Sequence, residues 1–293
     1  MNDMERDLIR CVIDNNLFGA KKYARCILLN NKAKSNQDFC DMMIRKMDNS
    51  DLMEIPSNIK GLLFVENTQD TFKAERYYLS EREQQIANTI IKMSDVSQKL
   101  SEIGVNYVNS TMLYGESGTG KTTFGKYIAH RLGLPFAYLN FSRAVDSYLG
   151  GTSKNISNVF DFVKQWKCVF MLDEVDAIGM ERGHSKEVGE LSRIVIGLMQ
   201  NLDMLTSDTV LLGATNRLDI IDKALLRRFT IQHEVKRLSE IERVEMARKF
   251  LSNVGFEMSE TEFSDLVNAD STQAELTNKI VMALVNHYSK ITV

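Results

Sequence analysis

The most informative part of this chain is a glycine-rich stretch, Gly115-Glu116-Ser117-Gly118-Thr119-Gly120-Lys121-Thr122. It fits the pattern G-x-x-x-x-G-K-[ST], follows a short apolar run at 112–114 and precedes a helical pattern at 123–132, which is the context that this pattern requires. Glycines let the backbone fold around a phosphate so that amide N–H groups point inward, and the helix N-terminus adds a positive partial charge. The stretch therefore predicts a strand, a phosphate-binding loop and a helix, in that order.

This loop carries the predicted contacts to a nucleotide and its metal ion. Lys121 is expected to reach the β- and γ-phosphates, and the hydroxyl of Thr122 is expected to ligate Mg²⁺. Because the backbone of such a loop does the binding, we assign nucleotide contact to the whole stretch and to the residue after it. The predicted cofactor-binding residues are Gly115, Glu116, Ser117, Gly118, Thr119, Gly120, Lys121, Thr122 and Thr123.

A second signal is an apolar, strand-like run at 168–172 that ends in two carboxylates, Asp173 and Glu174. Burying a charge without compensation is costly, so carboxylates at this point are expected to meet a cation or solvent in a cleft. We expect Asp173 to hold Mg²⁺ through its coordination shell and Glu174 to orient and polarise an attacking water. The alternative is a helix start, where acidic residues are also favoured. The phosphate loop in the same chain favours the catalytic interpretation.

Outward from these motifs, the pattern predicts three parts. Short apolar runs alternate with helical patterns, which indicates an α/β fold with a parallel sheet covered on both faces. The expected strands lie at 107–114, 136–140, 168–172 and 210–214, with a further short one at 62–65. We place the nucleotide-binding core at 76–236, a helical N-terminal region at 1–75 and a small helical lid at 237–293. Capping boxes at Ser80, Ser239 and Thr272, each with Glu three residues later, mark expected helix starts.

Composition narrows the function classes. The chain has 293 residues, 44% of them hydrophobic and 26% charged, with a net charge of −3, which is ordinary globular composition. This balance argues against a nucleic-acid binder that works by bulk positive charge, although the basic stretch 21–34 keeps a local patch open. The apolar runs fall far short of the roughly 20 residues of a membrane helix, and the polar start shows no secretory signal. The four cysteines lack metal or disulfide spacing, which favours a reducing, cytoplasmic location.

With these motifs in this order, residues 110–286 resemble an AAA+ ATPase of the protein-remodelling AAA branch, a group of P-loop NTPases. The resemblance implies that ATP and Mg²⁺ bind between the core and the lid. It implies that Asn216, after the run 210–214, senses the γ-phosphate or the lytic water. It also implies that Arg227 and Arg228 form the arginine-finger segment, which reaches the nucleotide of a neighbouring subunit. The alternatives are an Asn at an ordinary turn and arginines on the surface or in an internal ion pair.

The stretch Tyr148-Leu149-Gly150 resembles the pore loop with which relatives thread polypeptide. An aromatic face contacts any extended chain without demanding one sequence, and Gly150 keeps the loop flexible. A core tyrosine in a helix turn is the alternative. The resemblance implies a polypeptide substrate rather than nucleic acid, and a homo-oligomer for which six subunits is the family expectation.

The chain departs from the family pattern at three places. The phosphate loop has Glu-Ser at 116–117, where many relatives have prolines. No Pro-Gly insertion separates Arg227 from Arg228, so their individual roles stay open. The lid has Thr-Gln-Ala-Glu at 272–275 instead of Ser-Gly-Ala-Asp, so we expect no sensor-2 arginine there and expect Ala274 to pack near the adenine.

The predicted function is an ATPase that remodels or unfolds polypeptides. Hydrolysis would move the loop bearing Tyr148 and pull on a bound chain, while the N-terminal helices choose the client. Two other classes stay open: a nucleic-acid-directed AAA+ ATPase of the loader or transposition type, and a switch that binds ATP without turnover. A third alternative is a ring that regulates a separate protease or effector, since this chain shows no protease motif.

Overall fold

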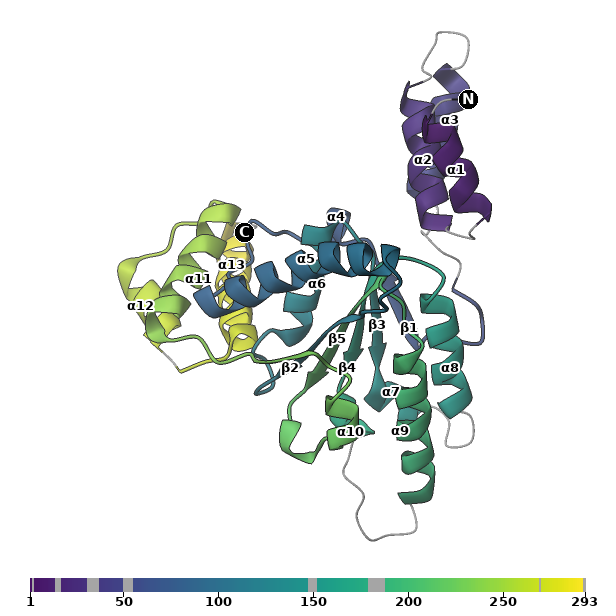
Figure 1. The fold of residues 1–293 in the computed structure, drawn as a ribbon. Helices are drawn as coiled ribbons and strands as arrows, with labels where there is room; N and C mark the ends of the chain where they lie inside the picture. The colour runs from purple at the N-terminus through teal and green to yellow at the C-terminus, as the bar shows by residue number, and fades with distance from the viewer. Residues whose placement is uncertain are drawn as a thin grey trace.

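Three helices form the N-terminal part of the chain. The computed structural model describes residues 1, 3–13, 17–30, 37–49, 55–146, 152–178, 188–268 and 270–291. The three helices are α1 (Asp3–Ile13), α2 (Leu17–Asn30) and α3 (Gln37–Asn49). They lie side by side and stand apart from the sheet (Figure 1). The helical character predicted for this region is therefore confirmed.

A six-stranded sheet forms the core, in the order β1-β3-β4-β5-β2-β6 (Figure 1). The strands are β1 (Leu63–Glu66), β2 (Asn109–Tyr114), β3 (Phe136–Asn140), β4 (Cys168–Asp173), β5 (Thr209–Thr215) and β6 (Ile231–Glu234). Neighbouring strands run parallel except for β1, which is antiparallel to β3. The strands β2, β4 and β5 are buried along almost their whole length, as parallel strands covered on both faces must be.

Side chains of β4 alternate between two hydrophobic layers, because successive residues of a strand point to opposite faces. Phe170 and Leu172 share a buried cluster with α8 (Thr152–Val163) and α9 (Val188–Asp203). Val169 and Met171 share the opposite cluster with α5 (Glu81–Glu102) and α6 (Lys121–Leu132). Each fully buried side chain of this kind contributes about 1.5–3 kcal/mol, so both helical layers are held firmly. The predicted α/β fold with two covered faces is confirmed.

The lid has a hydrophobic core of its own. Its helices are α11 (Glu240–Val254), α12 (Glu260–Asn268) and α13 (Gln273–Ile291), which enclose Ala247, Leu251, Leu266, Val267, Leu276 and Ile280. The predicted capping boxes are present at the starts of α5, α11 and α13, where each Glu side chain accepts from the backbone N–H of the capping residue. Each cap is worth about 0.5–2 kcal/mol. These caps mark the first residues of α5, α11 and α13.

The sheet extends beyond the sequence-based expectation at one edge, where β6 lies. Strand β6 was not predicted, because its Ile-Gln-His-Glu sequence is half exposed at the edge and forms no apolar run. Strand β1 confirms the short strand expected at 62–65, and its Leu63 belongs to the same buried cluster as β4. The sheet thus includes a strand that precedes residue 75. The division into 1–75, 76–236 and 237–293 stays a prediction.

Short helical elements complete the described chain: α4 (Thr68–Thr71), α7 (Phe141–Asp146), η1 (Val175–Ala177), η2 (Leu218–Ile220) and α10 (Lys223–Leu226). None of the helices in the described ranges combines the length and the apolar character that a bilayer-spanning helix needs.

Candidate active site

A pocket of about 570 Å³ lies between the phosphate loop, the carboxyl end of β4 and the lid. Residues of the loop, including Gly118, Lys121 and Thr123, line it together with Ala274 of α13, whose N–H donates to the carbonyl of Gly118. The site thus sits where parallel strands of an α/β sheet end, as ligand sites in such sheets generally do. Thr123 and Ala274, which were predicted to contact the nucleotide, both line this pocket.

The glycines of the loop hold conformations that other residues would resist. Gly115, Gly118 and Gly120 all have positive φ angles, of 145°, 80° and 94°. A Cβ atom at Gly115 would collide with the carbonyl oxygen of Val235, and one at Gly118 would lie 2.8 Å from the Thr272 hydroxyl oxygen. The segment after β6 and the start of α13 therefore pack closely against the loop and leave no room for a side chain at Gly115 or Gly118.

Lys121 joins the phosphate loop to the end of β5. Its Nζ donates to the carbonyl oxygens of Gly115 and Glu116 at 2.8 Å each, and to Oδ1 of Asn216 at 2.7 Å. Burial lowers the pKa of the Lys121 ammonium, while the carboxylates of Asp173 and Asp176 oppose that shift. The structure thus brings the predicted phosphate lysine and the predicted sensor asparagine within hydrogen-bond distance.

The predicted metal ligands also meet. The hydroxyl of Thr122 donates to Oδ2 of Asp173 at 2.7 Å, and the hydroxyl of Tyr138 donates to the same oxygen at 3.2 Å. Among the described residues no cluster of three or more His, Cys, Asp or Glu side chains is formed. Mg²⁺ needs no such cluster, because it takes one or two protein oxygens and completes its shell with phosphate and water. A hydroxyl and a carboxylate this close fit that ion.

Glu174 holds an unusual backbone conformation directly after β4. Its φ of 54° is the single positive value outside glycine in the described residues. Its N–H donates to Oδ1 of Asp173 at 2.9 Å, and the residue lines the pocket. A left-handed conformation in a non-glycine residue is strained and is typical of functional sites. It places the Glu174 side chain at the pocket beside the metal-ligand pair.

Asp176 is a residue of the site that the sequence-based prediction missed. Its Oδ1 accepts from the hydroxyl of Thr215 at 2.7 Å and from the N–H of Asn216 at 3.3 Å. It thereby ties the turn after β4 to the end of β5 and orients Asn216. The sequence shows an acidic residue at this position, but its partner Thr215 lies 39 residues away along the chain, so the contact could not be predicted.

The two candidate arginine-finger residues, Arg227 and Arg228, differ in their contacts and in their exposure. Arg228 forms a fork with Asp203, its Nε and Nη2 donating to the two carboxylate oxygens at 3.0 and 2.9 Å, and a third N–H donates to the carbonyl of Ala224. Arg227 ends α10, is exposed, and makes no ion pair with any residue that the structure describes. Neither side chain lines the pocket of its own subunit.

The far end of the pocket comes from segments that carried no sequence motif. Phe72 and Tyr77, which precede α5, line this part of the pocket together with Met246 and Phe250 of α11. The hydroxyl of Tyr78 donates to Glu245 at 2.7 Å and so joins the two walls. This apolar end suits the flat ring of a nucleotide base. The predicted pore-loop residues Tyr148, Leu149 and Gly150 lie outside the described residues.

Comparison with known proteins finds one matching family and several relatives. Residues 111–237 match the ATPase family associated with various cellular activities (AAA). The ATP-dependent zinc metalloprotease FtsH 1 of Salinibacter ruber is 31% identical over 188 residues, which are 62% of this chain and 27% of the relative. The proteasome-activating nucleotidase of Methanoculleus marisnigri is 30% identical over 176 residues, or 58% of this chain and 42% of the relative.

A third relative belongs to a eukaryote. The peroxisomal ATPase pex6 of Schizosaccharomyces pombe is 35% identical over 130 residues, 42% of this chain and 14% of the relative. The chain spans less than half the length of each of these three proteins. The segment that matches the family model includes most of the phosphate loop region, the acidic end of β4 and the asparagine after β5 of this chain. Together these findings place residues 111–237 in the AAA family of ATPases.

Proposed function

We propose that this chain hydrolyses ATP at subunit interfaces of an oligomer and uses the energy to unfold or remodel polypeptides. One observation carries the hydrolytic part: Lys121, Asn216, the Thr122–Asp173 pair and Glu174 converge on one pocket. Their types match the tasks of phosphoryl transfer, which needs charge neutralisation, metal coordination and an oriented water.

Each residue has a defined task in this proposal. Lys121 and the loop N–H groups bind the β- and γ-phosphates, and Thr122 and Asp173 hold Mg²⁺. The bound ion supplies neutralisation of the charge that develops on the phosphate oxygens. The Glu174 carboxylate accepts a hydrogen bond from the attacking water and draws on its proton, and the Asn216 amide donates to the γ-phosphate. Asp176 holds Asn216 in place.

Replacing Glu174 by glutamine is expected to leave ATP binding unchanged and to lower kcat about a hundredfold, since the amide keeps the shape but cannot take up a proton. Titration with a fluorescent ATP analogue and a phosphate-release assay separate the two effects. Glu257→Gln, an exposed change in the lid, serves as the matched control and should hydrolyse normally. Normal turnover by Glu174→Gln would remove Glu174 from the mechanism.

Arg227 is the residue through which one subunit would act on the nucleotide of its neighbour. Because Arg228 is tethered to Asp203 and Arg227 is exposed, Arg227 is the better candidate to reach a neighbour's nucleotide. A guanidinium keeps its charge and can fork onto phosphate oxygens. A homo-oligomer of six subunits follows from the resemblance to the family and is part of the proposal.

The substrate is proposed as polypeptide. Two of the relatives are named a protease and a proteasome-activating nucleotidase, so the matched segment occurs in proteins named for protein degradation. We extend the same class of substrate to this chain, with Tyr148, Leu149 and Gly150 as the threading loop. The alternative is that the oligomer regulates a separate protease or effector. The reducing cytoplasm stays the predicted location.

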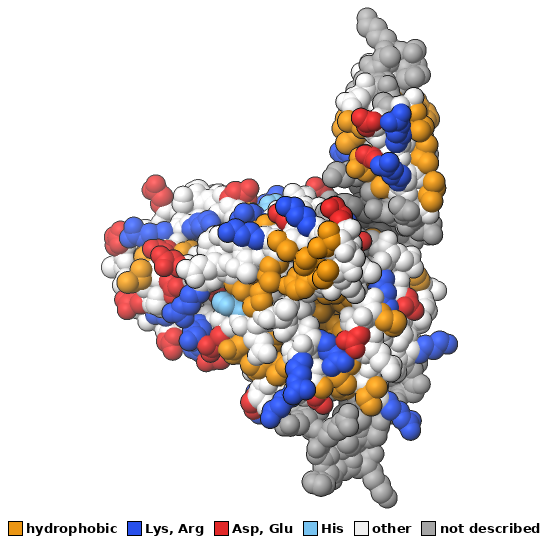
Figure 2. All heavy atoms as spheres, in the orientation of Figure 1, with side chains coloured by type: hydrophobic (Ala, Val, Ile, Leu, Met, Phe, Trp, Pro, Cys, Tyr) orange, Lys and Arg blue, Asp and Glu red, His pale blue; other side chains and the backbone are white. Residues whose placement is uncertain are grey.

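The nucleic-acid alternative has weaker support. On the face shown in Figure 2, Lys and Arg side chains are interspersed with Asp and Glu rather than gathered in one patch. A groove for nucleic acid needs clustered positive charge to release counterions. The ATP-switch alternative conflicts with a Glu174 that reaches the pocket.

One experiment separates the three classes. The ATPase rate of the full chain is measured alone, with a permanently unfolded protein and with double-stranded DNA. The proposal predicts stimulation by the unfolded protein and none by DNA. Stimulation by DNA alone would favour a loader-type function, and the absence of any hydrolysis would favour a switch.

A further inference from the structure

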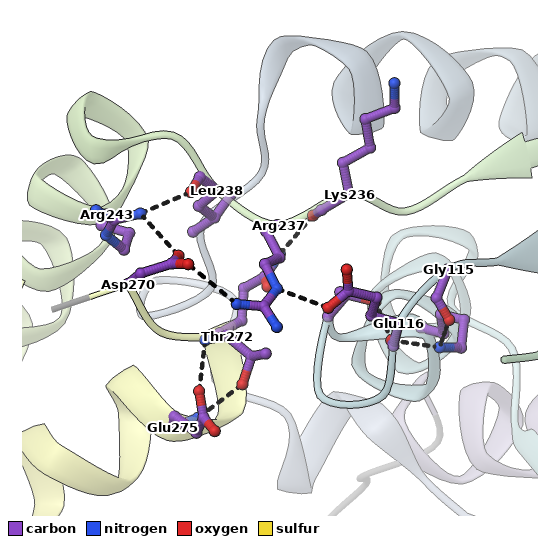
Figure 3. A network of polar contacts seen from close by, with 12 residues as sticks. Gly115, Glu116, Lys236, Arg237, Leu238, Arg243, Asp270, Thr272 and Glu275 are labelled. Atoms are coloured by element: carbon purple, nitrogen blue, oxygen red, sulfur yellow. Dashed lines mark hydrogen bonds and ion pairs between the residues drawn. The ribbon is translucent and has the colours of Figure 1, made fainter.

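Arg237 lies in the connector that joins the core to the lid. It follows β6 and precedes Ser239, the cap of α11. Its Nε donates to Oε2 of Glu116 in the phosphate loop at 2.7 Å, and its Nη1 donates to Oδ2 of Asp270 in the lid at 3.4 Å (Figure 3). One guanidinium therefore reaches the loop on one side and the lid on the other.

Glu116 is an unfavourable residue for a loop that receives a triphosphate. Its carbonyl oxygen faces the loop interior, where it accepts from Lys121 Nζ at 2.8 Å and from the Thr119 hydroxyl at 2.9 Å. Its carboxylate points away from that interior, toward Arg237 (Figure 3). A carboxylate held close to bound phosphates would repel them, and the ion pair keeps it turned away and neutralised.

The lid side of this network is built from several contacts. The N–H of Ala274 donates to the carbonyl of Gly118 at 3.0 Å, so the start of α13 sits directly on the phosphate loop. The side-chain amide of Gln273 donates to the carbonyl of Lys236, next to Arg237. Nη1 of Arg243 lies 3.9 Å from Oδ1 of Asp270, and Nε of Arg243 donates to the carbonyl of Val267 in α12 at 3.0 Å. Loop, connector and lid therefore form one connected unit.

We propose that Arg237 is a positioning residue for nucleotide binding, which holds the Glu116 carboxylate away from the phosphates of ATP. The inference rests on the proposed function, because it needs ATP in the pocket. Direct contact of Arg237 with the nucleotide is the competing explanation. Against it, Arg237 is absent from the described residues that line the nucleotide pocket and lines a neighbouring depression, which shares Glu83 and Leu238 with that pocket.

The test is a double-mutant cycle on the full chain. ATP affinity is measured by displacement of a fluorescent ATP analogue for Arg237→Ala, Glu116→Gln and the double variant. Arg237→Ala is expected to weaken ATP binding about three- to tenfold, because the pair is 40% and 63% exposed and therefore partly screened. The loss should shrink at about 0.5 M salt. In the double variant, affinity should return to that of Glu116→Gln.

A matched control removes another exposed ion pair. Lys167 pairs with Asp208 at 3.2 Å, with similar exposure, away from the pocket. Lys167→Ala is expected to leave ATP affinity unchanged, and thermal melting should show all variants folded. Glu116→Gln rescue is the readout that a merely structural role for Arg237 would not produce.

Two results would overturn the inference. If Arg237→Ala bound ATP as tightly as the unmodified chain, the ion pair would have no positioning role. If Glu116→Gln did not rescue the loss, Arg237 would act on the nucleotide itself. Failure of the proposed function is distinguishable from both, because it appears as the absence of ATP binding by the unmodified chain, and it would remove the inference as well.

Discussion

Replacing Lys121 by alanine is expected to weaken ATP binding about a thousandfold or more. The ammonium is positioned by Gly115, Glu116 and Asn216 and is the buried cation nearest the loop interior. Hydrogen bonds to charged groups are worth about 1.5–3 kcal/mol each, and two phosphate oxygens would lose theirs. The measurement is titration of the full chain with a fluorescent ATP analogue, competed with ATP.

A control for this change lies on the same helix. Lys126 forms an ion pair with Glu66 at 2.6 Å on the outside of α6. Lys126→Ala removes an equal charge and an equal side chain, but is expected to leave ATP affinity unchanged and to lower stability by at most about 1 kcal/mol. Tight ATP binding by Lys121→Ala would refute the assignment of the phosphate loop.

Replacing Arg227 by alanine is expected to lower kcat about a thousandfold while ATP binding stays close to normal. Arginine fingers act by stabilising charge that appears in the transition state, and their removal elsewhere lowers rates by about 10³–10⁵. The effect should therefore fall on turnover rather than on affinity. A phosphate-release assay at saturating ATP measures it.

Arg228→Ala is the matched comparison, since it removes the neighbouring arginine. That side chain ties α10 to Asp203, so its loss is expected to lower the melting temperature and to affect kcat less. Mixing Arg227→Ala subunits with Glu174→Gln subunits should restore some hydrolysis, because one intact site then forms across an interface. Equal kcat values for Arg227→Ala and the unmodified chain would rule out the finger.

The sequence predicted those parts of the site that lie within short segments. Gly115 to Thr122 form one continuous stretch, and Asp173 and Glu174 are adjacent. Their spacing was therefore enough to predict contacts with phosphate, metal ion and water. Their placement around one pocket follows from parallel strands that end at the same edge of the sheet. The role of Asn216 was predicted from the resemblance to the family, and in the structure its Oδ1 accepts a hydrogen bond from Lys121.

The remaining features depend on contacts between distant segments. Asp176, Arg237 and Phe72 meet their partners through the fold, and no local pattern distinguishes them from ordinary polar or apolar residues. The roles of Arg227 and Arg228 stayed open for the same reason, since the choice depends on Asp203 in a different helix. Strand β6 was missed because an edge strand with one exposed face lacks the continuous apolar run of a central strand.

The claim that the site is completed by a neighbouring subunit is tested most directly by specific ATPase activity measured against protein concentration. Particle mass is followed in the same samples. The account predicts activity per chain that is low where the protein is monomeric, rises as assemblies form and levels off once they are complete. Full activity per chain from particles whose mass is that of one chain would contradict it.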